Sequence, residues 1–156
     1  MNATYAGPAD CPSVLPVFPL AGALLLPRGS LPLNIFEPRY LAMVDHVLAG
    51  DRMIGMIQPR GEDAEARDLF DVGCAGRLTQ FAETGDGRVL LTLTGVSRFR
   101  IVEQLDVATP FRQCRVDYAP FADDFEARRG EDAVDRNALI DALRRFADAN
   151  DLKVDW

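Results

Sequence analysis

The sequence predicts a mainly β (α+β) fold, in which a small barrel-like sheet has one helix packed over it and a C-terminal helical segment follows. Three observations lead to this prediction. Short apolar runs, several with apolar residues at every second position, alternate with turns rich in Gly and Pro. Only one stretch before residue 120 has helical periodicity. A long strand-like run contains Gly95 at its middle, which indicates a strand that bends as the sheet curls.

Taken in order, the chain of 156 residues divides into three parts. Residues 1–13, rich in Ala, Pro, Asn and Asp, indicate a flexible leader. Residues 14–120 hold the expected strands and the first helix, and they are numerous enough to close a core. Residues 121–156 form a charged linker and a helical segment.

An apolar run beginning at Val14 predicts the first strand. Pro16 and Pro19 interrupt this run, and proline cannot donate to a sheet ladder. We therefore expect an edge strand, or a strand whose proline positions face away from a partner. The second strand is expected at residues 31–36, where every second residue is apolar, as is typical of a half-buried strand.

One helix is predicted between Glu37 and Gly50. Pro38 suits the first helical turn, because its missing N–H is not needed there. Apolar residues then recur at steps of three and four and form one stripe: Tyr40, Leu41, Val44, Val47 and Leu48. Gly50 is expected to end the helix by adopting the left-handed cap conformation.

Four more strands are predicted at residues 53–58, 71–81, 88–102 and 111–118. The first is a continuous apolar run, which favours a central position in the sheet. The charged segment after it, residues 59–68, is expected to be a mobile loop. Glycines at 73 and 76 indicate a bulge in the next strand. Thr84–Gly87 is typical of a hairpin turn.

The last part of the chain contains a helical pattern with one apolar side, formed by Val134, Leu139, Leu143 and Phe146. Asn150 is a suitable cap for this helix. Little sequence follows that could cover the apolar side. If these side chains have no partner within the chain, we expect a homodimer that forms through the C-terminal helix.

Composition and charge oppose several classes of function. The net charge of −7 and the scattered arginines argue against nucleic acid as a partner. Three widely spaced cysteines and one histidine do not supply a metal site, and free thiols indicate a reducing compartment. No segment has the roughly 20 apolar residues of a membrane span, and the first residues do not resemble a signal peptide. We expect a cytoplasmic protein with no cofactor, no metal and no membrane partner.

Catalytic residues are not expected either, and the sequence predicts that the chain is not an enzyme. The single lysine, Lys153, does not belong to a phosphate-binding Gly-Lys-Ser/Thr motif, and its place near the chain end does not suit a Ser–Lys dyad. His46 lies beside the apolar stripe, without a nucleophile motif near it. Acidic pairs such as Asp123 and Asp124 indicate a solvated charge run rather than facing catalytic carboxylates.

Four segments resemble, in the same order and with similar spacing, the amino-terminal domain family of Lon proteases. They are Leu-Pro-Val-Phe-Pro-Leu at 15–20, Pro-Leu-Asn-Ile-Phe-Glu-Pro-Arg-Tyr at 32–40, Asp-Leu-Phe-Asp-Val-Gly-Cys-Ala-Gly at 68–76, and Gly-Val-Ser-Arg-Phe-Arg-Ile at 95–101. The resemblance implies a pseudo-barrel related to the PUA fold, with a helical continuation. It also implies binding of unfolded or exposed apolar protein segments for a protease. Because catalytic residues are not expected here, our hypothesis is an adaptor or decoy for a protease. Free-standing relatives usually continue further, so truncation after Trp156 is compatible with the pattern.

Candidate peptide-binding residues lie where strand, loop and helix are expected to meet: Leu25, Leu26, Leu33, Phe36, Arg39 and Tyr40. Leu25 and Leu26 precede Pro27 in a loop, and we expect them to be exposed. For Leu33 and Tyr40 the alternative is an ordinary place in the core. For Arg39 the alternative is an ion pair with a nearby acid. An extended peptide could also add to an open sheet edge.

Two other functions stay open. A PUA-like barrel can read RNA, although the acidic composition opposes this. A barrel-like sheet can also hold a small molecule.

Overall fold

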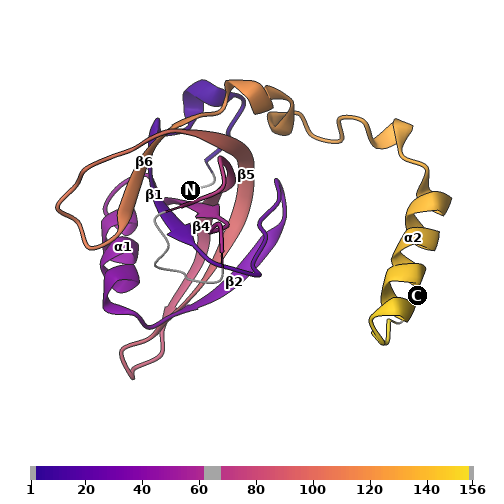
Figure 1. The fold of residues 1–156 in the computed structure, drawn as a ribbon. Helices are drawn as coiled ribbons and strands as arrows, with labels where there is room; N and C mark the ends of the chain where they lie inside the picture. Colours follow the sequence, from indigo (N-terminus) through magenta and orange to yellow (C-terminus); the bar gives the residue numbers. More distant parts are fainter. Residues whose placement is uncertain (1–2, 62–67, 155–156) are drawn as a thin grey trace. The chain divides into compact units, whose positions relative to one another are not determined.

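The computed structural model describes residues 3–61 and 68–154, and its sheet closes into a barrel (Figure 1). The strands are β1 (Val14–Pro19), β2 (Ser30–Ile35), β3 (Met53–Ile57), β4 (Val72–Glu83), β5 (Val89–Gln104) and β6 (Arg112–Asp117). The helices are α1 (Pro38–Leu48) and α2 (Arg136–Ala149), with 3-10 turns η1 (Pro8–Asp10), η2 (Ala119–Phe125) and η3 (Glu131–Ala133). The predicted mainly β (α+β) fold is confirmed.

The order of strands in the sheet is β2-β5-β4-β3-β1-β6, and β6 also pairs with β5, which closes the ring. Among the strands of the described residues, only the pairing of β1 with β3 is parallel. The first half of β5 pairs with β2 and the second half with β6. On its other side, β5 pairs with β4 from Val89 to Arg100. Among the described strands, β2 therefore has a neighbour on one side only.

β5 curves round the barrel, and Gly95 lies between its two halves (Figure 1). The backbone N–H of Gly95 donates to the carbonyl of Gly29 at 2.9 Å, and its carbonyl accepts from the N–H of Arg28 at 2.8 Å. A Cβ at Gly95 would overlap the carbonyl oxygen of Leu26. Glycine is thus needed at this bend because another backbone segment lies directly against it.

The first strand is not an edge strand, so that alternative was wrong. β1 pairs with β6 over Val14–Val17 and with β3 over Val17–Pro19. Pro16 has a register partner only in β6, and Pro19 only in β3. The change of partner at Val17 leaves each proline with one side where no ladder hydrogen bond is needed, as the second alternative stated.

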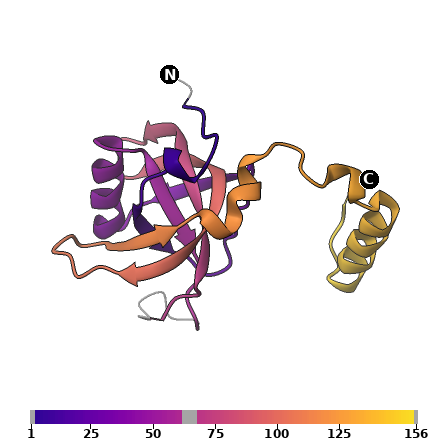
Figure 2. The same ribbon diagram turned by 90° about the horizontal axis from the view of Figure 1, so that it is seen from above.

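α1 begins at Pro38, with Glu37 as its N-cap, and packs against the barrel (Figure 2). Its buried side chains, Tyr40, Met43, Val44 and Val47, join Phe18, Ile54 and Leu91 in one core cluster. The C-cap is Ala49, and the left-handed residue that follows is Arg52, with φ 57°, rather than the expected Gly50.

A second core cluster surrounds Phe99, which is fully buried. Cys114 belongs to this cluster, and Cys74 belongs to the cluster beneath α1. Both are free thiols in buried strand positions, as expected. Burial raises the pKa of Cys74 to about 12 and that of Cys114 to about 11.

Residues 3–13, for which a flexible leader is predicted, include η1 and lie against the barrel. Tyr5 and Cys11 pack on the cluster around Phe99. The Pro12 carbonyl accepts a hydrogen bond from the Tyr118 hydroxyl at 3.1 Å. Most of the predicted mobile loop, residues 59–68, lies outside the described residues.

The contacts divide the chain into two compact units, Met1–Glu126 and Ala127–Trp156. In the second unit, Asp135 caps α2 by accepting from the N–H of Ala138 at 3.0 Å. Asp151 is left-handed after the helix, and the N–H of Leu152 donates back to the carbonyl of Ala147 at 2.9 Å, which ends the helix in a Schellman motif. The predicted domain boundaries at 13 and 120 stay predictions.

Within that unit, the apolar side of α2 is exposed at Leu139, Leu143 and Phe146. No helix in the described part of the chain is both long enough and apolar enough to span a membrane.

Candidate functional site

Two hollows lie beside β2 and share part of its surface. The β5 hollow, of about 380 Å³, is lined by Pro32–Asn34, by Gln80–Ala82 of β4 and by Leu90–Thr92 of β5. The α1 hollow, of about 250 Å³, is lined by Phe18–Leu20, Pro32–Glu37 and Tyr40. Because Pro32, Leu33 and Asn34 line both, β2 forms the wall between them.

Large apolar side chains stand exposed around these hollows. Phe36 is 63% exposed, Leu90 47% and Phe81 40%. Single exposed apolar residues are ordinary, but a group of them beside two hollows is typical of an interaction surface.

The free edge of β2 adds backbone groups to this surface. β2 pairs with β5 from Ser30 to Ile35, and no described strand pairs with its other side. An open edge can accept a further strand through main-chain hydrogen bonds. Pro32 removes one donor from β2, which weakens the edge as a template for uncontrolled pairing.

The structure brings three of the six predicted site residues together. Leu33 is half-buried and lines both hollows, while Phe36 and Tyr40 line the α1 hollow. Tyr40 is only 5% exposed, and its ring packs on Phe18 with centroids 4.1 Å apart, so most of this residue belongs to the core. Leu33, Phe36 and Tyr40 thus form one wall of the candidate site.

Arg39 lies beside this wall rather than in it. Its Nε donates to Glu37 at 3.0 Å, and its guanidinium lies 4.7 Å from the centroid of the Tyr40 ring. The ion-pair alternative for Arg39 is therefore present in the structure.

The two loop leucines differ from each other. Leu25 is 3% exposed, so its expected exposure was wrong. A Cβ at Gly76 would lie 2.6 Å from Leu25 Cδ2, which means that this glycine leaves the room that Leu25 fills. Leu26 is 55% exposed, as expected, but it lines neither hollow.

Leu90 and Phe81 were missed by the sequence reasoning, although a signal for Leu90 existed. Val89, Leu91 and Leu93 alternate inward along β5. An apolar residue between them, such as Leu90, must then point outward. An outward leucine beside other exposed apolar side chains, here Phe36 and Phe81, is a sign of a contact surface.

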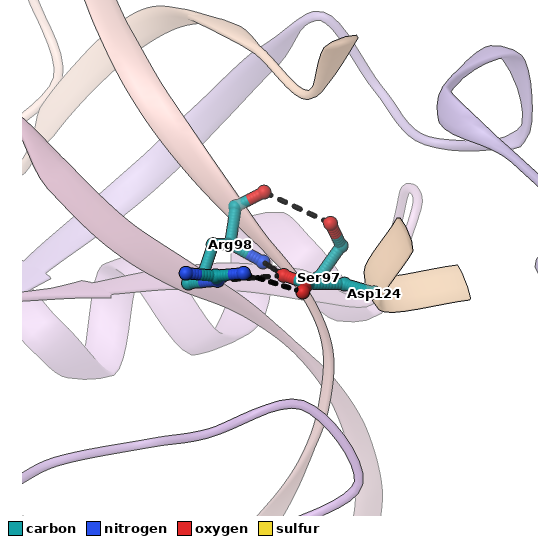
Figure 3. A network of polar contacts seen from close by, with 3 residues as sticks. All are labelled: Ser97, Arg98 and Asp124. Carbon is teal, nitrogen blue, oxygen red and sulfur yellow. Dashed lines mark hydrogen bonds and ion pairs between the residues drawn. The ribbon is translucent and has the colours of Figure 1, made fainter. Parts of the chain in front are cut away.

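A polar network near the bend of β5 also differs from expectation (Figure 3). Arg98 donates to Asp124 from Nε at 2.9 Å, from Nη2 at 2.8 Å and from its backbone N–H at 2.9 Å. The Ser97 hydroxyl donates to the Arg98 carbonyl at 2.9 Å. The Asp124 side chain is only 10% exposed, so Asp124 is not the solvated charge that the sequence suggested. The ion pair between Arg98 and Asp124 holds η2 against β5.

The hydrogen bonds from Arg98 lower the pKa of Asp124 below its ordinary value. A carboxyl with a lowered native pKa stabilises the fold above its unfolded pKa, and this contribution is lost as the pH falls through the native pKa. We expect Asp124→Asn to reduce the free energy of unfolding by about 1 kcal/mol at pH 7, since Arg98 is half exposed. The difference from the parent should shrink below about pH 4.

Urea unfolding at pH 7 and at pH 3 measures both values. Asp106→Asn, at an exposed position, is the control and should leave the stability unchanged. Equal stability of Asp124→Asn and the parent at pH 7 would show that the pair contributes nothing.

The site contains apolar surface and backbone groups rather than reactive ones. His46 lies with its ring against Phe111, 5.3 Å between centroids. Within residues 3–61 and 68–154, no group of three His, Cys, Asp or Glu side chains is placed to hold a metal ion. The geometry is suited to binding.

Comparisons with known proteins point to one family. The family model of the ATP-dependent protease La (LON) substrate-binding domain matches residues 14–151. Lon protease 2 of Myxococcus xanthus is 33% identical over 111 residues, which are 69% of this chain and 13% of that protein. The Lon protease of Anaeromyxobacter dehalogenans is 28% identical over 141 residues, 88% of this chain and 16% of that protein. This chain thus spans only a small part of the curated relatives' length.

Two solved structures are similar as well. A Lon N-terminal domain protein from Xanthomonas campestris has 28% identity and a TM-score of 0.56, over 67% of this chain and 59% of the other. The N-terminal domain of a Mycobacterium avium complex Lon protease has 17% identity and a TM-score of 0.55, over 67% of this chain and 54% of the other, which supports the fold alone.

Proposed function

This chain belongs to the family of ATP-dependent protease La (LON) substrate-binding domains, and we propose on this premise that it binds exposed apolar segments of unfolded or partly folded proteins. The domain of this family is non-catalytic, in agreement with the prediction that the chain is not an enzyme. The observation that carries the proposal is the pair of hollows on either side of a strand with a free edge.

In the proposed complex, an extended client segment lies along β2 and places apolar side chains in the β5 and α1 hollows. The backbone of β2 at residues 32–34 touches the client at both hollows, while Phe36 and Leu90 cover it from the two sides. Burial of one apolar side chain contributes about 1.5–3 kcal/mol, and ordering of the segment opposes part of this. We therefore expect weak binding that tolerates many sequences, as a receptor for unfolded chains requires.

Three further parts of the proposal rest on the sequence. The first is a protease that receives the bound clients, and the second is a cytoplasmic location. The third is a homodimer through the apolar side of α2, where Leu139, Leu143 and Phe146 are exposed.

Leu90→Thr tests the proposed surface. We expect this variant to bind a fluorescently labelled, unstructured apolar peptide about fivefold to tenfold more weakly than the parent, because it removes one apolar wall of the β5 hollow. Fluorescence anisotropy measures the affinity, and thermal unfolding confirms that the variant is folded.

Leu24→Thr is the matched control. Leu24 is 70% exposed and lines neither hollow, so its replacement should leave the affinity unchanged. Equal losses in both variants, or no loss in Leu90→Thr, would contradict binding at β2.

A further inference from the structure

A third hollow lies further along the same strands and has a different chemical character. This arginine hollow, of about 310 Å³, is lined by Tyr5, Arg28, Arg77, Thr79, Thr94 and Asp124, with apolar surface from Val96 and Phe125. All of these residues belong to the first compact unit.

The described lining residues of the arginine hollow carry a net positive charge although the chain carries a net charge of −7. Arg28 and Arg77 line it, and Asp124 is the one carboxylate among its described lining residues. Arg98 already holds that carboxylate with two side-chain hydrogen bonds. Two guanidinium groups and one carboxylate thus line the hollow, so its described lining residues carry more positive than negative charge.

Donor groups in the arginine hollow are arranged around open space. Arg77 Nη1 donates to the Tyr5 hydroxyl at 2.8 Å. The hydroxyls of Thr79 and Thr94 lie 3.0 Å apart. Arg28 is exposed and has no ion-pair partner among residues 3–61 and 68–154. A guanidinium presents a planar fork of donors that matches a carboxylate, so this set of groups favours a carboxylate ligand.

The arginine hollow and the β5 hollow lie on the same face of β5. Leu90 and Thr92 line the β5 hollow, and Thr94 and Val96 line the arginine hollow. These four residues alternate with buried ones, so their side chains point to one side of the strand. The two hollows are therefore displaced by about four residues along β5, which is at most about 13 Å at about 3.3 Å per residue because the strand bends at Gly95. One extended segment can reach both.

We propose that the arginine hollow binds a carboxylate of the same client segment that fills the β5 hollow. Recognised segments then carry an apolar side chain and an acidic group about four residues apart. This inference rests on the proposed function and adds a chemical preference to it. The carboxylate comes from an acidic side chain within the segment or from the carboxyl terminus of the client.

The backbone of Arg28 supplies a suitable variant. Arg28 has φ 65°, in the left-handed region where glycine is favoured. Arg28→Gly removes the guanidinium without straining the backbone, so loss of stability is not expected. Arg52 is also exposed, has φ 57° and lines none of the three hollows. Arg52→Gly is therefore a control that matches both the charge and the backbone change.

The test uses labelled decapeptides with one Leu-Phe pair and either Glu or Gln four residues away, in both chain directions. In a third pair, Gln four residues after the Leu-Phe pair is the last residue. One peptide of this pair has a free carboxyl terminus and the other an amidated one. We expect the parent to bind a carboxylate peptide about fivefold to tenfold more tightly than its neutral partner at low salt, and less so as salt increases. Arg28→Gly should abolish this ratio, and Arg52→Gly should retain it.

The peptide pairs also separate the two sources of the carboxylate. Preference for the Glu peptide identifies an internal acidic side chain, and preference for the free terminus identifies the client's chain end. Equal affinity of the carboxylate peptide and its neutral partner in every pair would overturn this inference and leave apolar binding intact. The inference would also be overturned if Arg52→Gly lost the carboxylate preference as fully as Arg28→Gly. Absence of binding by all peptides would instead refute the proposed function.

Discussion

Replacement of Phe99 by alanine is expected to reduce the free energy of unfolding by about 3–5 kcal/mol. Phe99 is fully buried at the centre of its core cluster, and its ring packs edge-on to Tyr118 with centroids 6.5 Å apart. Two glycines face the ring: a Cβ at Gly55 would lie 2.9 Å from Phe99 Cζ, and one at Gly73 would lie 2.6 Å from it. With no side chains at these positions to move inward, the cavity cannot be filled.

Urea unfolding followed by far-UV circular dichroism measures this loss. Phe36→Ala is the matched control, because Phe36 is 63% exposed and its truncation should change the stability little while weakening peptide binding. A loss below about 1.5 kcal/mol for Phe99→Ala would mean that the barrel interior collapses around the gap.

Gly95→Ala is expected to have the second large effect, a loss of about 2–3 kcal/mol. The new Cβ would overlap the Leu26 carbonyl oxygen and would lie 2.8 Å from Leu26 C and 3.2 Å from Pro27 Cα. These are backbone atoms of a segment that hydrogen bonds to Gly95 through Arg28 and Gly29. Relief of the overlap requires that segment to move, which breaks these hydrogen bonds.

Thermal unfolding and the peptide measurements together test this expectation. The melting temperature should fall, and the carboxylate preference should weaken because Arg28 moves with the loop. Gly50→Ala is the control, since a Cβ there meets only the His46 carbonyl at 3.6 Å. An unchanged melting temperature in Gly95→Ala would show that the loop is not held against β5.

The strands and α1 could be predicted because their signals are local. The alternation of Leu31, Leu33 and Ile35 predicted β2 as a half-buried strand, and Pro38 marked the start of α1. Gly95 marked the bend of β5, although its cause, the approach of residues 26–29, could not be predicted from the strand itself.

Features that depend on distant pairs were missed. Arg98 and Asp124 are 26 residues apart, and neither position in the sequence indicates the other. Leu25 is buried because Gly76, in a different strand, leaves space for it. The left-handed residue after α1 was predicted to be Gly50, because glycine adopts this conformation most easily. In the structure it is Arg52.

The candidate site was predicted in part for the same reason. Leu33, Phe36 and Tyr40 lie within eight consecutive positions, so their proximity follows from β2 and α1 alone. Leu90 and Phe81 line the β5 hollow, on the other side of β2. They come close to β2 only because β4, β5 and β2 pair in the sheet. The arginine hollow likewise forms because the sheet brings Arg28 and Arg77, which are distant in sequence, to the same hollow.

The amide chemical shifts of the isotope-labelled chain, recorded during titration with an unfolded apolar client peptide, test the proposed binding most directly. We expect the largest changes in β2 and at residues 80–82 and 90–92, which line the β5 hollow. Changes confined to α2, with β2 and these residues unaffected, would contradict binding of clients at the free edge of the barrel.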